Sequence, residues 1–305
     1  MRGVLVALGL VGLVVSGSAT PGAAAAPALT PGAILSQGAP AANDAFEVTL
    51  DFEALKQGQT GVVTVSGTGI AGARLRFLNR LIDCYAVGDI WHGLLGINME
   101  QSPNTYPLEV LVWFEDGARN SWEGEVTIED GGFGRQDVTL GADLAYLLEP
   151  EVDRAERSRL EAIFNQVTPT RYWDGPFQKP LDAEFTSPFG AWRLYNNSLW
   201  GRHTGIDLRG PAGTPLLAPA AGRVVLAERL DVRGNYVLID HGWGIYSGLA
   251  HLSEIHVTRG QFVRQGQVIG VSGSTGRSSG PHIHWEIAVN GEWVDPSQFF
   301  EIELP

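Results

Sequence analysis

The run HIHWEI at residues 282–287 alternates strictly between polar and apolar side chains. Strict alternation is the pattern of a β-strand, whose successive side chains point to opposite faces of a sheet. One face of this strand carries His282, His284 and Glu286. The other face is fully apolar and belongs in a core; it carries Ile283, Trp285, Ile287 and Val289. Both histidines must therefore look into whatever lies on the opposite side of the sheet.

Similar alternation recurs through the N-terminal half of the chain, between turn clusters rich in glycine. It is found at residues 46–52, 62–65, 73–77, 108–114 and 125–128. Short strands at this spacing predict an antiparallel sandwich of immunoglobulin-like type over residues 46–145. Nothing in this region looks catalytic, and we expect His92 to be a structural or surface residue.

A helical connection is expected between two β domains. Residues 151–166 mix charged side chains with apolar ones in an amphipathic helical pattern; the apolar residues are Val152, Ala155, Leu160, Ile163 and Phe164. We assign residues 146–183 to this connection. From residue 184 the chain returns to short strands and turns, so residues 184–305 are expected to form a second, compact antiparallel β domain. The predicted fold class is therefore mostly β.

The N-terminus reads as an export signal. Arg2 precedes an apolar run at residues 3–15, and small residues follow it, so we expect a signal peptide over residues 1–26. Residues 27–45 are rich in Ala, Pro and Gly and predict a flexible tether. The mature protein is then expected in the cell envelope or outside the cell, with no stable membrane span. The single cysteine, Cys84, excludes an intramolecular disulfide and is expected to be a small buried residue.

The charge balance excludes one class of partner. The formal net charge is −13, and the binding of nucleic-acid phosphates needs clustered Lys and Arg. A group-carrier domain is also excluded, because such carriers need an acceptor lysine and no lysine follows Lys179.

Histidines concentrate in the C-terminal domain, where six of the seven lie after residue 200. In the segment HTGID, His203, Gly205 and Asp207 would share one face of a strand, and the glycine would leave space above the backbone. His251 ends another strand-like run. Together with the HxH segment these residues offer two or three imidazoles and a carboxylate, a ligand set that zinc accepts. The residues alone do not distinguish metal ligands from proton carriers.

Four ordered segments resemble those of the lysostaphin-type zinc metallo-endopeptidases, which cut the peptide part of peptidoglycan. The segments are TSPFG at 186–190, HTGID at 203–207, AHLS at 250–253 and GPHIHWE at 280–286. The resemblance covers about residues 184–300 and implies a fold of the lysostaphin and duplicated-hybrid-motif type. Carried over position by position, it implies that His203, Asp207 and His284 bind Zn²⁺. It implies that His251 and His282 are an unliganded catalytic pair, without indicating which is the general base.

The function implied is a secreted zinc endopeptidase acting on peptidoglycan stem or cross-bridge peptides. Three protein ligands leave one coordination position for water, as catalytic zinc sites require. An alternative is a non-catalytic envelope regulator that activates other wall hydrolases; that hypothesis predicts broken ligand positions. The sandwich is expected to contact the wall or an envelope protein partner. An amidase or a carboxypeptidase would use the same chemistry and is disfavoured only by the resemblance.

Three further residues have open or structural interpretations. His241 is expected to be structural or to support the site indirectly. His256 follows a turn and is expected at the surface. Glu286 either orients a metal ligand by hydrogen bonding or is a solvated carboxylate at the far end of its strand. The glycine-rich segment 270–280 lacks a Gly-Lys-Ser/Thr ending and is expected to form a wall of the substrate groove rather than a phosphate loop.

Overall fold

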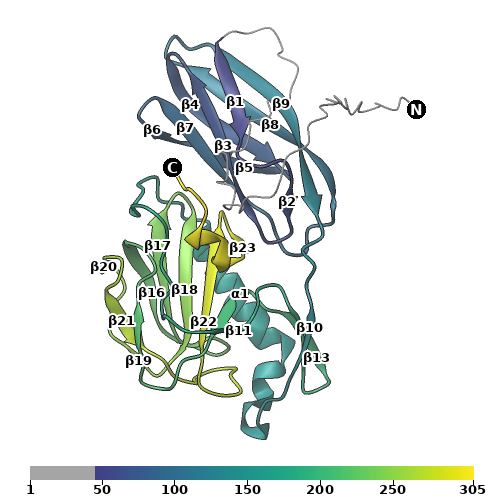
Figure 1. Cartoon of the computed structure of the whole chain (residues 1–305), viewed down its shortest axis with the longest axis vertical. Helices are drawn as coiled ribbons and strands as arrows, with labels where there is room; N and C mark the ends of the chain where they lie inside the picture. The colour runs from purple at the N-terminus through teal and green to yellow at the C-terminus, as the bar shows by residue number, and fades with distance from the viewer. Residues whose placement is uncertain (1–44) are drawn as a thin grey trace, which may run out of the picture. The chain divides into compact units, whose positions relative to one another are not determined.

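The computed structural model describes residues 45–305 (Figure 1). The predicted signal peptide and nearly all of the predicted tether lie outside the described residues. Within the described part, no helix has the length and apolar character needed to cross a membrane.

The N-terminal part is a sandwich of two sheets, as predicted. One sheet has the order β1 (Phe46–Leu50), β3 (Thr60–Gly67), β7 (Ile90–Gly96) and β6 (Tyr85–Val87). The other has the order β2 (Leu55–Lys56), β9 (Arg119–Glu129), β8 (Asn104–Phe114), β4 (Ile70–Phe77) and β5 (Arg80–Asp83). Inward-facing residues such as Val63, Leu75 and Val110 form a buried core between them, because alternate side chains on each strand are apolar. Cys84 is buried in this core, as expected.

The C-terminal part is built on one large antiparallel sheet, which also confirms the prediction. Its main path is β11 (Phe185–Ser187), β14 (Ile206–Leu208), β22 (Ile283–Val289), β18 (Ile245–Leu252), β17 (Gly234–Gly242), β16 (Gly222–Leu230) and β20 (Phe262–Val263). An additional strand, β23 (Glu292–Val294), pairs with β22. A smaller sheet has the order β15 (Pro215–Leu217), β21 (Val268–Val271) and β19 (Glu254–Ile255), and a short 3₁₀ helix, η2 (Pro296–Phe300), follows β23.

The two faces of the large sheet have different coverings. The apolar face of β22 lies in the main core as predicted, with Ile283, Trp285, Ile287 and Val289 fully buried. On the opposite face, β17, β18 and β22 contribute a separate apolar cluster that includes Tyr236, Tyr246, Ala250 and Ala288. His284 and Glu286 belong to this second face because they alternate with the core residues of β22.

The helix α1 (Pro150–Phe164) covers part of the second face; η1 (Ala142–Leu148) precedes it. The helix predicted at 151–166 is thereby confirmed. Leu160 and Phe164 pack into the cluster with Tyr246. Glu156 lies one turn before Leu160, in line with these two residues, and is also buried. The buried stripe of α1 therefore starts with a carboxylate, which the apolar pattern did not predict.

A third small sheet brings further residues to the same face. In it β10 (Arg135–Val138) pairs in parallel with β12 (Trp192–Tyr195), and β12 forms a hairpin with β13 (Leu199–Arg202). Asn196 and Asn197 form the hairpin turn with φ of 47° and 54°. Asparagine tolerates this left-handed conformation in tight turns, and Ser198 completes the three-residue connection between the strands. The hairpin directs the chain from β12 back to His203, just after β13.

Candidate metal centre

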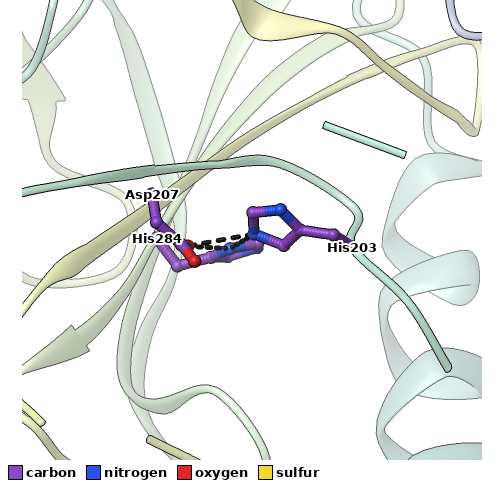
Figure 2. Close-up of side chains that lie close together, drawn as sticks. All are labelled: His203, Asp207 and His284. Atoms are coloured by element: carbon purple, nitrogen blue, oxygen red, sulfur yellow. Dashed lines mark hydrogen bonds and ion pairs between the residues drawn. The ribbon is translucent and has the colours of Figure 1, made fainter. Parts of the chain in front are cut away.

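Three of the predicted site residues converge on one point (Figure 2). In the register of β14 and β22, Asp207 lies directly opposite His284. His203 Nε2 lies 2.9 Å from Asp207 Oδ1 and 3.0 Å from His284 Nδ1, and the last two atoms are 3.1 Å apart. All three residues are buried, and their possible ligand atoms lie within 4.8 Å of one another. Side chains 81 residues apart in sequence thus present their lone-pair atoms to a common centre.

The segment before β14 differs from the predicted strand. The strand starts at Ile206, and residues 203–205 form a connection from β13. The predicted role of Gly205 nevertheless holds, since a Cβ there would lie 2.2 Å from the carbonyl oxygen of Trp285. A glycine is required for this close approach to β22. The approach, rather than a shared strand face, brings His203 next to Asp207.

Hydrogen bonds outside the cluster fix which atoms face the centre. His203 Nδ1 lies 2.6 Å from the carbonyl oxygen of Pro188, which can only accept, so Nδ1 carries the proton and Nε2 presents a lone pair. Arg193 from the β12–β13 hairpin donates to Asp207 Oδ2 at 2.5 Å and to Ser187 Oγ at 2.8 Å. Asp207 Oδ1 is thereby left to face the two histidines.

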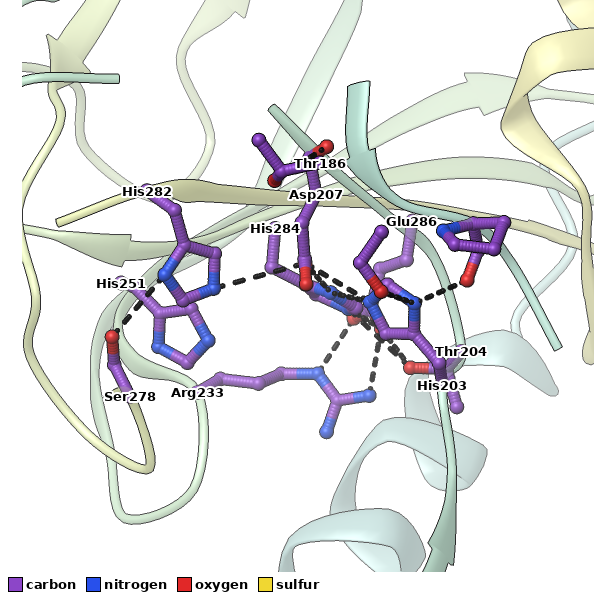
Figure 3. A network of polar contacts seen from close by, with 12 residues as sticks. Thr186, His203, Thr204, Asp207, Arg233, His251, Ser278, His282, His284 and Glu286 are labelled. Carbon is purple, nitrogen blue, oxygen red and sulfur yellow. Dashed lines mark hydrogen bonds and ion pairs between the residues drawn. The ribbon is translucent and has the colours of Figure 1, made fainter. Parts of the chain in front are cut away.

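Glu286 fixes the third donor and is fully buried, which decides between the two interpretations of this residue (Figure 3). Its Oε2 lies 3.1 Å from His284 Nε2 and accepts a hydrogen bond from Thr204 Oγ1 at 2.8 Å. Its Oε1 accepts from the Tyr236 hydroxyl at 2.6 Å. The carboxylate takes the proton-bearing Nε2 of His284, so Nδ1 presents a lone pair to the cluster.

Arg233 lies between two buried carboxylates, Glu286, which Figure 3 shows, and Glu156 of α1. It donates to Glu286 from Nε at 2.6 Å and from Nη2 at 2.9 Å, and to Glu156 of α1 from Nη1 at 2.8 Å. The side chains of Arg233, Glu156 and Glu286 are 9%, 4% and 0% exposed. An ion-paired chain of contacts therefore runs from the helix to His284.

The electrostatics of the cluster favour a bound cation. Burial lowers the pKa of His203 to about 4, against the opposing effect of Asp207, so its imidazole is neutral at pH 7. Burial would raise the pKa of Asp207, but His203, His284 and Arg193 hold it well below its usual range. Burial would lower the pKa of His284, but Asp207 and Glu286 raise it. The carboxylates that raise the pKa of His284 would also attract a metal cation, and two imidazoles with an ionised carboxylate are a zinc ligand set.

His251 and His282 lie beside this cluster, with ring centroids 4.8 Å apart (Figure 3). His251 Nδ1 lies 2.8 Å from the Thr275 carbonyl oxygen, and His282 Nδ1 lies 2.8 Å from that of Gly280. Each Nδ1 therefore carries a proton and each Nε2 presents a lone pair. Burial, His282 and His284 hold the pKa of His251 well below its usual range. The backbone of His251 has φ of 66°, an uncommon left-handed conformation for a residue with a side chain.

A cleft opens over the cluster between α1, the β12–β13 hairpin and the large sheet. It is lined by Asp153, Arg157, Arg193, Tyr195, Arg202, His203, Thr204, Val232, Arg233, His251, Arg277 and His284. Arg277 comes from the glycine-rich segment 270–280. The cluster of His203, Asp207 and His284 is therefore reachable from solvent along a polar, arginine-rich surface.

The remaining histidines lie elsewhere. His241 is fully buried, with Nδ1 2.8 Å from the Ala221 carbonyl oxygen and its ring 4.8 Å from that of Phe177, so it is structural. His256 is exposed next to Glu254, as expected. His92 is half-buried in the sandwich, where it hydrogen-bonds Thr64.

Four residues of the site region were not predicted from the sequence: Glu156, Arg193, Arg233 and Tyr236. The only local signal was Arg233, a charged residue next to the apolar strand β17. A single charge at a strand end is usually solvated, so this signal did not identify a buried ion pair.

Comparison with known protein families gives a match within the C-terminal domain. Residues 201–296 match the family described as peptidase family M23. The C-terminal domain belongs to peptidase family M23. This confirms the resemblance to the lysostaphin-type metallo-endopeptidases. The match contains all five predicted site residues.

Relatives of the M23 domain are found in other bacteria. DD-carboxypeptidase/endopeptidase Mpg of Neisseria meningitidis is 46% identical over 114 residues, which are 37% of this chain and 26% of that protein. Peptidoglycan DD-endopeptidase ShyA of Vibrio cholerae is 45% identical over 123 residues, 39% of this chain and 29% of that protein. The chain thus matches little more than a quarter of the length of these two relatives.

One solved structure is similar beyond the M23 domain. A crystal structure from Pseudomonas aeruginosa, described as peptidase M23, has a TM-score of 0.61 and 28% sequence identity. The similarity covers 83% of this chain and 96% of that one. Coverage of this extent includes strands of the sandwich as well as the M23 domain, so this two-part fold occurs in another bacterial protein.

Proposed function

We propose that this chain is a zinc-dependent endopeptidase that hydrolyses peptide bonds in peptidoglycan. The observation that carries the proposal is the convergence of His203, Asp207 and His284 on one buried point, with His251 and His282 beside it. The name of the Vibrio cholerae relative, peptidoglycan DD-endopeptidase, supports the choice of substrate, and the name of the Neisseria relative supports the endopeptidase activity.

We propose that His203 Nε2, Asp207 Oδ1 and His284 Nδ1 hold the zinc ion. Each atom presents a lone pair to the same centre, because Pro188, Arg193 and Glu286 engage the opposite atom of each side chain. A bound Zn²⁺ would polarise the scissile carbonyl and lower the pKa of a water molecule to about 7. The protein supplies two imidazoles and one carboxylate as ligands, and the hydrogen bonds that orient them.

The proposed task of His251 and His282 is to move protons and to stabilise negative charge. Both rings present Nε2 as an acceptor, since Thr275 and Gly280 hold the Nδ1 protons. An imidazole in this state can accept a proton from the attacking water and return it to the leaving amine. In its protonated form it can donate a hydrogen bond to the developing oxyanion. We propose that the pair divides these tasks.

The proposed location is the cell envelope or the exterior of the cell. The predicted signal peptide at residues 1–26 and the peptidoglycan substrate of the named relatives support it. The sandwich is proposed to hold the peptidase on the wall or on an envelope partner. Deletion of residues 46–129, which contain its two sheets, should therefore reduce binding to isolated cell wall; unchanged binding and localisation would contradict this role.

The test is to incubate the purified chain with intact peptidoglycan, with and without a zinc chelator, and to identify the released fragments by mass spectrometry. Chelator-sensitive release of peptide-cleaved fragments is expected, and the fragments name the bond. Chelator-sensitive cleavage between sugar and peptide would instead identify an amidase. No release from protein that contains no zinc would favour the regulator hypothesis, although all five site residues are present.

A further inference from the structure

The cleft is cationic in an acidic protein. The chain carries a formal net charge of −13, yet five of the twelve residues that line the cleft are arginines and only one, Asp153, is a carboxylate. A local charge opposite to that of the whole molecule attracts ligands of the opposite sign and repels others. The contacts of each guanidinium group decide which of them can bind such a ligand.

All five arginines have contacts within the protein, and those of three do not involve Asp153. Arg233 is neutralised by Glu156 and Glu286, and Arg193 is paired with Asp207. Arg202 stacks over the rings of Trp192 and Phe133, at 4.1 Å and 4.7 Å from their centroids, and donates to the Met99 carbonyl. The two that remain are Arg157 on α1 and Arg277 in the segment before β22.

Arg157 and Arg277 share a single carboxylate. Arg157 Nε donates to Asp153 Oδ2 at 2.6 Å, and Arg277 Nη2 donates to Asp153 Oδ1 at 3.2 Å. Burial would raise the pKa of Asp153, but Arg157 and Arg277 lower it, so the carboxylate stays ionised. Two guanidinium groups and one carboxylate leave one positive charge at this wall of the cleft.

Both guanidinium groups are held in place and keep donors free. The Arg277 guanidinium lies 4.6 Å from the ring centroid of Tyr195, which is buried, and Arg277 is only 11% exposed. The Arg157 side chain is 45% exposed, and among residues 45–305 its two terminal nitrogens have no acceptor. Arg277 also donates to the Leu147 carbonyl oxygen from Nη1 at 3.5 Å. Asp153 thus holds both arginines at the wall of the cleft, where each keeps N–H groups that no acceptor among residues 45–305 takes.

We infer that Arg157 and Arg277 form a binding subsite for a carboxylate of the peptide substrate, next to the metal cluster. This inference rests on the proposed function and names the chemistry that the peptidase recognises. Guanidinium groups bind carboxylates through paired hydrogen bonds, and a charge-assisted bond contributes more than a neutral one. A peptidoglycan stem peptide offers two sources of this group, its C-terminal carboxylate and the carboxylates of its side chains.

The experiment compares three synthetic stem peptides with the full chain. One peptide has all its carboxylates free, one has a C-terminal amide, and one has amidated side-chain carboxylates. The amide that lowers kcat/KM identifies the source of the carboxylate. In Arg157→Gln and Arg277→Gln, kcat/KM for the free peptide should fall about 10- to 100-fold, mainly through KM, the loss typical of one to two charge-assisted hydrogen bonds. For the discriminating amide the two variants should equal the unmodified protein.

The matched control is Arg159→Gln on the same helix, because Arg159 is exposed and pairs with Glu228 away from the cleft. It should change none of the three kcat/KM values. Zinc content and melting temperature of each variant check that the fold and the metal site are intact. Equal kcat/KM for all three peptides, unchanged in both cleft variants, would overturn the inference while leaving the endopeptidase proposal standing.

Binding of the same peptides to the chelator-treated chain, measured by calorimetry, separates the inference from the proposed function. If no peptide is cleaved but the free peptide binds at least 10-fold more tightly than one of the amides, and this preference is lost in Arg277→Gln, the subsite stands and the endopeptidase proposal fails. If the three peptides bind alike, the subsite fails whatever the activity.

Discussion

Removing the guanidinium of Arg233 should destabilise the protein far more than removing an exposed arginine. Arg233 separates two carboxylates, Glu156 and Glu286, whose side chains are 4% and 0% exposed. In an Arg233→Met variant both carboxylates would stay buried without their partner. Breaking a buried ion pair in this way costs about 3–5 kcal/mol. For a domain of 150–250 residues each kcal/mol lowers Tm by about 2–4 °C, so we expect a loss of about 6–20 °C.

The assay is thermal unfolding followed by circular dichroism, in the presence of a chelator so that metal binding does not add to the stability. Arg159→Met is the control, because its ion pair with Glu228 is exposed and such pairs contribute about 0–1 kcal/mol. A loss of stability in Arg233→Met equal to that of the control would refute the reasoning. It would mean that water or a rearranged side chain compensates the two carboxylates.

Further predictions concern the metal cluster, a close backbone contact and a buried histidine. His203→Ala should lose both zinc and activity, whereas His251→Ala should keep zinc and lose most turnover; metal analysis beside kinetics checks this, and near-normal turnover in His251→Ala would reverse its assignment. Gly205→Ala should destabilise the protein and weaken zinc binding, because its Cβ would meet the Trp285 carbonyl at 2.2 Å, and unaltered zinc affinity would contradict that. His241 has a pKa lowered by burial from 6.5 to about 4, so the unfolded chain binds more protons between these values. The contribution of His241 to the free energy of unfolding, up to about 3 kcal/mol, should be complete above pH 6.5 and lost as the pH falls to 4. In urea unfolding between pH 4 and 7, a His241→Gln variant should therefore lose less stability than the unmodified protein.

The sequence predicted those parts of the site that lie on one strand. Alternation along β22 identified both faces correctly, because a strand buried on one side must repeat its apolar residues with period two. The pairing of Asp207 with His284 needed more than alternation, since register between distant strands is set by the whole sheet. The resemblance to a known family supplied that link. For the same reason the sequence placed His203 on a strand, whereas it lies in the connection before β14.

The ion-paired part of the site could not be predicted. Glu156 and Arg233 are 77 residues apart, and each is surrounded by residues that suit a solvated position. The helical pattern of α1 was correctly identified from residues that include Leu160 and Phe164. Glu156 lies in line with these two, but glutamate is almost never fully buried, so its charge assigned it to solvent. Only the three-dimensional arrangement shows that one turn of α1 extends past the apolar cluster and reaches the guanidinium. Arg193 was missed for a similar reason, because the β12–β13 hairpin carries it to Asp207.

The position of α1 has a consequence for how the peptidase can be divided. The family match starts at residue 201, after the helix and after Arg193. A fragment cut at that boundary would keep all five histidine and aspartate residues of the site. It would lack Glu156, the wall residues Asp153 and Arg157, and the arginine that holds Asp207. We therefore expect a stable, active fragment of this chain to begin before residue 150, ahead of the family match that starts at residue 201.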